Sequence, residues 1–150
     1  MKVKVYEATL LTKSEYHHNE KFIHVQGSWW LKEDRKPSPG DNCYYCFRNS
    51  VSCAHPSNIE GIVPAIRIDK FEHDLPSGSK ISYAGLTFTA LNIVDGGRYA
   101  LCDTIIHEMA FREEDAQDAN IYAFSDIRKW LNEWYNANGD EAETIDDENL

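Results

Sequence analysis

The sequence predicts a single α+β domain of short antiparallel strands, about two helices and long loops. Short runs rich in Val, Ile, Trp and Tyr recur at residues 2–11, 28–31, 61–68 and 81–94, as is typical of strands. One amphipathic helix pattern follows Ser125. At 150 residues and 42% hydrophobic, the chain has the size of one ordinary domain. We therefore expect one hydrophobic core.

The N-terminal elements follow from alternation and from a capping motif. Residues 2–11 indicate one strand, and a single change of phase in its alternation suggests a bulge. Thr12 followed by Glu15 has the form of a capping box, which predicts a short helix over 13–19. Two further short strands are expected at 22–25 and 28–31.

The middle of the chain alternates between loops and strands. Residues 32–42 contain two prolines and many polar residues, so they form a loop in this interpretation. A small hairpin is expected next, with strands at 44–47 and 51–54. Residues 61–68 follow as a core strand that carries Pro64, which indicates a sheet edge, a bulge or a strand start.

The C-terminal half contains the strongest local signals. Residues 81–94 are the longest strand signal, and the turn at 95–97 predicts a hairpin with residues 99–102. Within the ambiguous stretch 103–124, residues 104–111 could form a strand or a helix, and residues 112–120 indicate a charged loop. Ser125 is a good N-cap for a helix that ends near 136–139. Four apolar residues share one face of this helix, namely Ile127, Trp130, Leu131 and Trp134.

Charge divides the chain into a folded domain over 1–138 and an acidic tail over 139–150. The formal net charge is −10, and six acidic residues follow residue 139 with no Lys or Arg among them. We expect the tail to be solvated and disordered. The alternative is a tail that contacts a basic partner.

Composition also limits the partners. An acidic chain is not expected to bind nucleic acid directly, because phosphate binding needs clustered Lys and Arg. The N-terminus has no apolar segment typical of a secretory signal, and no apolar run approaches 18 residues. We therefore expect a cytoplasmic location and no membrane contact. The oligomeric state stays open.

Three motifs carry a resemblance to a known family. Residues 28–31 read Ser-Trp-Trp-Leu, residues 61–66 read Gly-Ile-Val-Pro-Ala-Ile, and residues 125–132 read Ser-Asp-Ile-Arg-Lys-Trp-Leu-Asn. They resemble a family of bacterial and phage domains of unknown function with Trp-Trp-Leu-Arg-Ser-Pro-Gly, Gly-Val-Arg-Pro-Ala-Leu and Ser-x-Ile-Arg-x-Trp-Leu-Asn motifs. That family looks like a branch of the C-type-lectin-like fold, near the sulfatase-modifying-factor domains. The resemblance implies a C-type-lectin-like domain here.

Two departures from the family pattern matter. The order of the motifs is reversed, which a circular permutation explains, and the permutation predicts that strands 61–68 and 81–94 are antiparallel neighbours. Lys32 and Val63 stand where the family has arginines. A role that depends on those arginines therefore does not transfer to this chain.

The cysteines offer one candidate metal site. Cys43, Cys46, Cys53 and His55 lie within thirteen residues and could bind zinc, although the spacing matches no standard zinc finger. Buried or idle thiols, or a disulfide or redox pair, are the alternatives, and no cofactor is expected. Sulfatase-modifying relatives use reactive cysteines close to the position of Trp29 and Trp30, where this chain has none. No complete catalytic constellation is found, so we expect no enzyme.

A recognition loop is the leading functional prediction. The region 32–60 carries aromatic and adaptable polar residues of the kind found in binding loops, and the candidate ligand-binding residues are Tyr44, Tyr45, Arg48, Asn49, His55 and Asn58. The predicted function is non-catalytic binding of a protein or a small polar ligand. The aromatics could instead fold onto the core. The second hypothesis is an acidic phage or prophage inhibitor that occupies a basic surface of a host nucleic-acid-binding protein.

Overall fold

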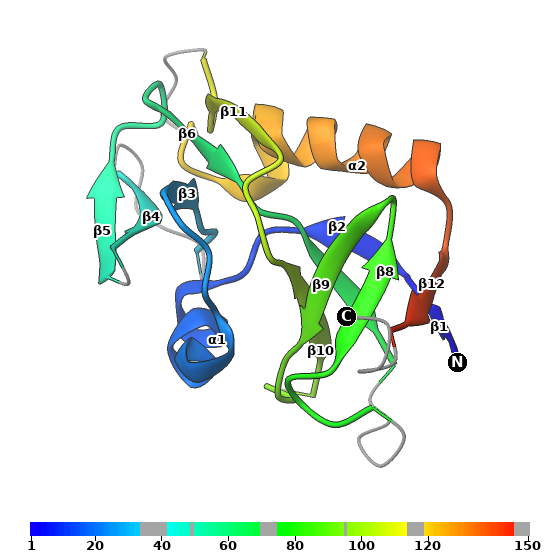
Figure 1. The fold of residues 1–150 in the computed structure, drawn as a ribbon. Helices are drawn as coiled ribbons and strands as arrows, with labels where there is room; N and C mark the ends of the chain where they lie inside the picture. The colour runs from blue at the N-terminus through cyan, green and yellow to red at the C-terminus, as the bar shows by residue number, and fades with distance from the viewer. Residues whose placement is uncertain (34–41, 49, 70–74, 95, 114–118, 146–150) are drawn as a thin grey trace.

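The computed structural model describes residues 1–33, 42–48, 50–69, 75–94, 96–113 and 119–145. These residues form a mixed α+β domain of mostly antiparallel strands in two curled sheets (Figure 1). The predicted fold class is therefore confirmed as α+β with short antiparallel strands and two α-helices in the described ranges. The helices are α1 (Lys13–His18) and α2 (Asp126–Asn138), with short 3-10 turns η1 (Glu20–Phe22) and η2 (Tyr122–Phe124).

The large sheet has seven strands in the order β1-β12-β8-β9-β10-β7-β2. Its strands are β1 (Lys2–Lys4), β2 (Glu7–Thr9), β7 (Ala65–Ile68), β8 (Lys80–Tyr83), β9 (Leu86–Ala90), β10 (Arg98–Cys102) and β12 (Glu141–Thr144). The small sheet has five strands in the order β11-β6-β3-β4-β5. They are β3 (Ser28–Trp30), β4 (Cys43–Phe47), β5 (Ser50–Ala54), β6 (Ile59–Ile62) and β11 (His107–Ala110).

The large sheet curls because its two edge strands are consecutive in the chain. Only Val5 and Tyr6 separate β1 from β2. The Val5 amide donates to the Asp140 carbonyl at 2.8 Å, and the Tyr6 amide donates to the Arg67 carbonyl at 2.9 Å. The chain thus crosses directly from one edge to the other. The prediction of one bulged strand over 2–11 is wrong, because the change of phase marks two strands with different partners.

The predicted tail is also part of this sheet. β12 pairs with β1 and with β8, and Ala142 is buried opposite Val3. The prediction of a disordered end from residue 139 is therefore wrong for residues 141–144. Residues 146–150 lie outside the described residues.

Two predictions about the long strands need correction. The segment 81–94 contains a tight hairpin between β8 and β9, where Ala84 and Gly85 have φ angles of 54° and 75°. The segment 61–68 divides at Val63 and Pro64, so that β6 belongs to the small sheet and β7 to the large sheet. β7 pairs with β10 and β2, not with β8 or β9. The predicted antiparallel neighbours are therefore not adjacent.

The helix predictions are confirmed. The Thr12 amide donates to Glu15 Oε1 at 2.8 Å, and the Glu15 amide donates to Thr12 Oγ1 at 3.1 Å, which completes the capping box. Ser125 Oγ accepts from the Arg128 amide at 3.0 Å and caps α2. The strand expected at 22–25 is wrong, because η1 begins at Glu20 and no strand follows it before β3.

Both tryptophans of β3 belong to the core. Trp29 and Trp30 are 1% and 0% exposed, and Trp30 Nε1 donates to the Met109 carbonyl at 2.9 Å. β3 also runs parallel to β6 with Trp29 opposite Gly61. A Cβ atom at Gly61 would lie 2.8 Å from the Ser28 carbonyl oxygen, so this close approach requires glycine. The Trp-Trp pair is thus the centre of the small sheet.

Candidate functional site

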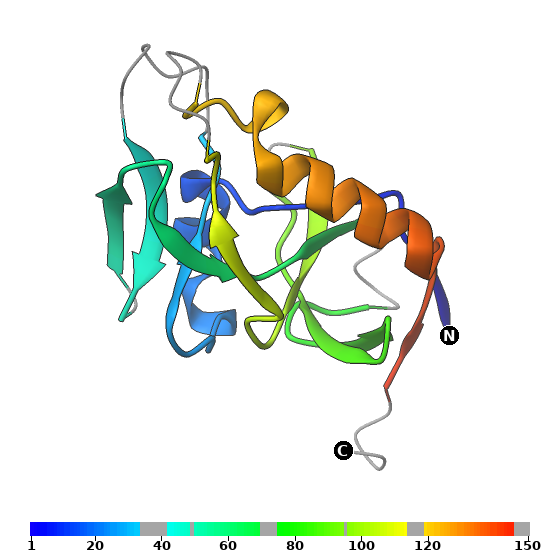
Figure 2. The same cartoon turned by 90° about the horizontal axis from the view of Figure 1, so that it is seen from above.

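The hairpin β4–β5 stands at the periphery, on the side of the molecule away from β1 and β12 (Figures 1 and 2). Tyr45 pairs with Ser52, and Phe47 pairs with Ser50. Side chains alternate between the two faces of a strand, so these four residues share one face. Tyr44, Cys46, Val51 and Cys53 share the other face.

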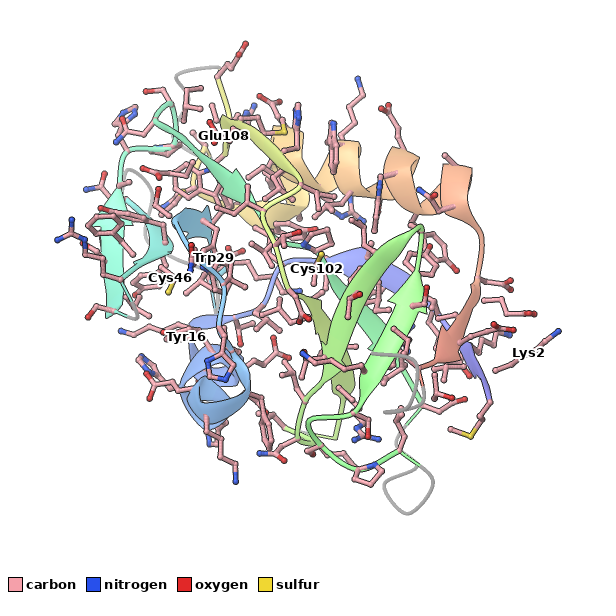
Figure 3. The ribbon with its side chains drawn as sticks, in the orientation of Figure 1. Lys2, Tyr16, Trp29, Cys46, Cys102 and Glu108 are labelled. Carbon is pink, nitrogen blue, oxygen red and sulfur yellow. The ribbon has the colours of Figure 1, made fainter. Side chains whose placement is uncertain are left out.

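α1 covers the part of the second face that β4 provides, around Tyr44 and Cys46. Lys13 Nζ lies 5.0 Å from the centroid of the Tyr44 ring. The rings of Tyr16 and Trp29 meet edge to face, 6.0 Å apart. Figure 3 shows Tyr16, Trp29 and Cys46 gathered between α1 and the small sheet. Burial raises the pKa of Tyr16, and hydrogen bonding to Cys46 adds to this effect.

The first face is open toward β5, and we call its five residues the hairpin surface: Tyr45, Phe47, Arg48, Ser50 and Ser52. The Tyr45 ring meets the buried Trp30 ring edge to face at 6.4 Å, and Tyr45 itself is half-buried. Phe47 is 43% exposed. The Arg48 guanidinium lies 5.0 Å from the centroid of the Phe47 ring. The hairpin surface therefore combines a half-buried tyrosine that is held by Trp30, an exposed phenylalanine ring and one guanidinium group.

The five predicted ligand-binding residues that the structure describes do not form one site. Tyr45 and Arg48 lie on the hairpin surface, whereas Tyr44 lies on the opposite face and packs below Lys13. The alternative that the aromatics fold onto the core thus holds in part. Asn49 lies outside the described residues.

His55 and Asn58 are exposed in the turn after β5, where the Asn58 amide donates to the His55 carbonyl at 3.0 Å. Arg48 precedes β5 and His55 follows it, so the two lie roughly 20 Å apart at the usual rise of a strand. Phe47 belongs to the predicted recognition region but is absent from the six predicted ligand-binding residues. Its two-residue spacing from Tyr45 was the available signal for a shared face.

The four zinc candidates do not converge. Cys43 and Cys46 are three residues apart on β4 and therefore point to opposite faces of the strand. Cys43 is buried, and burial raises its pKa to about 12. Cys53 is exposed on β5. In the described part of the chain, no group of three or more His, Cys, Asp and Glu side chains is placed to hold a metal ion.

A second aromatic cluster lies on α2. The apolar face of α2 was predicted from four residues. Two of them, Ile127 and Leu131, are fully buried, whereas Trp130 and Trp134 are only half-buried. The exposed His107 of β11 stacks on Trp130 at 4.8 Å, with 2° between the ring planes. Both tryptophans also pack against the core, where the Trp134 ring meets the buried Tyr83 ring edge to face at 5.6 Å. Sequence periodicity could not show the stack on Trp130, because the partner His107 comes from another element.

No family model, curated protein or solved structure matches this chain. The resemblance to the C-type-lectin-like family therefore stays a prediction. Neither described helix combines the length and apolar composition that a membrane span needs.

Proposed function

We propose that the chain is a non-catalytic binding module that recognises a protein partner through the hairpin surface. The observation that supports this proposal is the pairing of Phe47 and Arg48. An exposed phenylalanine with a guanidinium over its ring combines the residue types that dominate binding energy at protein interfaces. Tyr45 and Trp30 fix the strand beneath them, which lowers the entropy cost of binding.

The charge of this region narrows the partner. Residues 42–59 contain no Asp or Glu, and Arg48 is their only Lys or Arg, in a chain with a net charge of −10. The complementary surface is therefore apolar with a carboxylate placed to meet Arg48. We expect a protein patch of this composition rather than a nucleic acid.

Affinity capture with matched variants tests the proposal. The immobilised protein is exposed to a lysate of its source organism, and captured proteins are identified for the wild type, Phe47→Ala and Phe124→Ala. Phe124 is 59% exposed in η2, far along the chain from the hairpin, and is the control. We expect Phe47→Ala to weaken binding of the specific partner at least about tenfold. Phe124→Ala should leave this binding unchanged. Equal loss in both variants, or in neither, would contradict the proposal.

Ionic strength separates this proposal from an acidic inhibitor. Recognition through one arginine predicts a shallow dependence of affinity on salt. It also predicts that binding is lost in Arg48→Ala but kept in Arg128→Ala. An inhibitor that uses its overall charge predicts a steep dependence on salt and indifference to both substitutions.

A further inference from the structure

β5 is an open edge of the small sheet. Among the described residues it pairs with β4 alone, at the end of the strand order. Two residues link Phe47 to Ser50 across the hairpin turn. In a hairpin of this length, the two residues next to the turn form a hydrogen-bonded pair, and every second pair along the ladder does the same. The amide and carbonyl groups of Ser50 and Ser52 therefore point toward β4. The amide and carbonyl groups of Val51 and Cys53 therefore point outward, away from the sheet.

This edge lacks the features that usually prevent strand pairing. β5 reads Ser-Val-Ser-Cys-Ala, with no charged residue and no proline, and its five pairs with β4 run without a break. Natural edges are commonly protected by lysine, proline, bulges or covering elements. β1, by contrast, carries Lys2 and Lys4, and β2 carries Glu7 paired with Arg67 at 3.3 Å. The exposed edge of β5 is thus available for pairing.

We propose that β5 pairs with β5 of a second copy of this chain, antiparallel and centred on Ser52. This register sets Val51 opposite the partner's Cys53 and Cys53 opposite the partner's Val51. The outward backbone groups of each strand then meet their complements across the two-fold axis. The facing side chains are small and uncharged.

Charge favours this contact over other faces of the molecule. The net charge of −10 opposes self-association in general, but residues 42–59 contain none of the carboxylates. Pairing through β5 therefore joins the copies at a segment that lacks acidic side chains. One short strand from each copy buries less area than a standard interface, so the dimer is weak.

Pairing in the plane of the sheet leaves the hairpin surface open. A two-fold axis between antiparallel strands is perpendicular to the sheet, so both hairpin surfaces face the same side of the dimer. The dimer would then present two copies of Phe47 and Arg48 together. A partner with repeated sites would bind with increased avidity.

Sedimentation equilibrium over about 10 µM to 1 mM protein tests the dimer, with dimers expected in the upper part of this range. Val51→Pro removes an outward amide donor but none that faces β4, and proline is tolerated at such edge positions. We expect this variant to keep the wild-type circular dichroism spectrum and to associate at least tenfold more weakly. A wild type that stays monomeric throughout, or a dimer unaffected by Val51→Pro, would overturn the proposal.

Disulfide trapping tests the register in a Cys53→Ser background. Ser52→Cys places two thiols opposite each other at the axis, and oxidised glutathione should convert it to a covalent dimer. Ser50→Cys is the control, because its partner position is residue 54 and not residue 50. Equal trapping of both variants, or trapping of the control alone, would overturn the register. Phe47→Ala should dimerise normally, so loss of partner capture and loss of dimer are separate outcomes.

Discussion

Phenylalanines in the two sheets differ in their exposure to solvent. Phe88 in β9 of the large sheet is fully buried, whereas Phe47 in β4 of the small sheet is 43% exposed. The edges of the large sheet are joined through Val5 and Tyr6, whereas β5 leaves one edge of the small sheet open. The large sheet thus has its two edges linked by the chain, whereas the small sheet buries Trp29 and Trp30 but keeps Phe47 and the edge strand β5 at the surface.

The largest difference in stability is expected between two Phe→Ala variants, one in each sheet. Phe88→Ala should lower the free energy of unfolding by about 3–5 kcal/mol, because it leaves a cavity beside Tyr83 in the core. Phe47→Ala should change it by less than about 1 kcal/mol, since that ring is largely exposed. Urea denaturation followed by circular dichroism measures both. Similar losses in the two variants would break the contrast between the sheets.

Truncation tests how the large sheet is completed. A chain that ends at residue 140 lacks β12, so it loses the ladders with β1 and β8 and the buried Ala142. We expect a loss of about 2–3 kcal/mol in the free energy of unfolding, from backbone pairs and apolar burial together. A chain that ends at residue 145 keeps β12 and serves as the control. If both truncations have the wild-type stability, β12 contributes nothing to the fold.

Alkaline pH should give the smallest of the three effects. Burial raises the pKa of Cys43 from its ordinary 9.0 to about 12, and that of Tyr83 from 10.0 to about 12. Both groups stay neutral when folded and ionise first in the unfolded chain. Their stabilising contribution is therefore complete below pH 9 and is lost as pH rises toward 12. From these two groups, the free energy of unfolding should fall by about 1 kcal/mol between pH 8 and pH 9.5.

A variant assigns that pH effect to one sheet. Cys43→Val removes the thiol of the small sheet and keeps Tyr83 in the large sheet. Urea titrations at a series of pH values should show a shallower alkaline loss in this variant. An unchanged slope would mean that the tyrosines alone cause the effect.

The local parts of the fold could be predicted from the sequence. The capping box of Thr12, the N-cap of Ser125 and the β4–β5 hairpin depend on residues that are close in the chain. The division of β1 from β2, the break at Pro64 and the pairing of β12 depend on partners far away in the sequence. The acidic composition after residue 139 led to a prediction of disorder. That prediction failed because composition does not reveal that β12 completes the sheet between β1 and β8.

The candidate site followed the same rule. Alternation could place Tyr45 with Phe47 and separate both from Tyr44. It could not show which face α1 covers, because that depends on the packing of Tyr16 against Trp29. Tyr45 and Arg48 thus share the hairpin surface while Tyr44 lies on the other face, and a ligand-binding role for any of them stays a prediction.

The pairing of β1 with β12 also affects how the chain acquires its fold during synthesis. β1 is translated long before β12, yet Lys2 of β1 pairs with Glu143 of β12. Contacts so distant in sequence form slowly, and β1 has no partner among the described strands until β12 has been translated. The small sheet depends on strands that emerge earlier, up to Ala110 of β11. The small sheet can thus assemble on the nascent chain before the large sheet is completed.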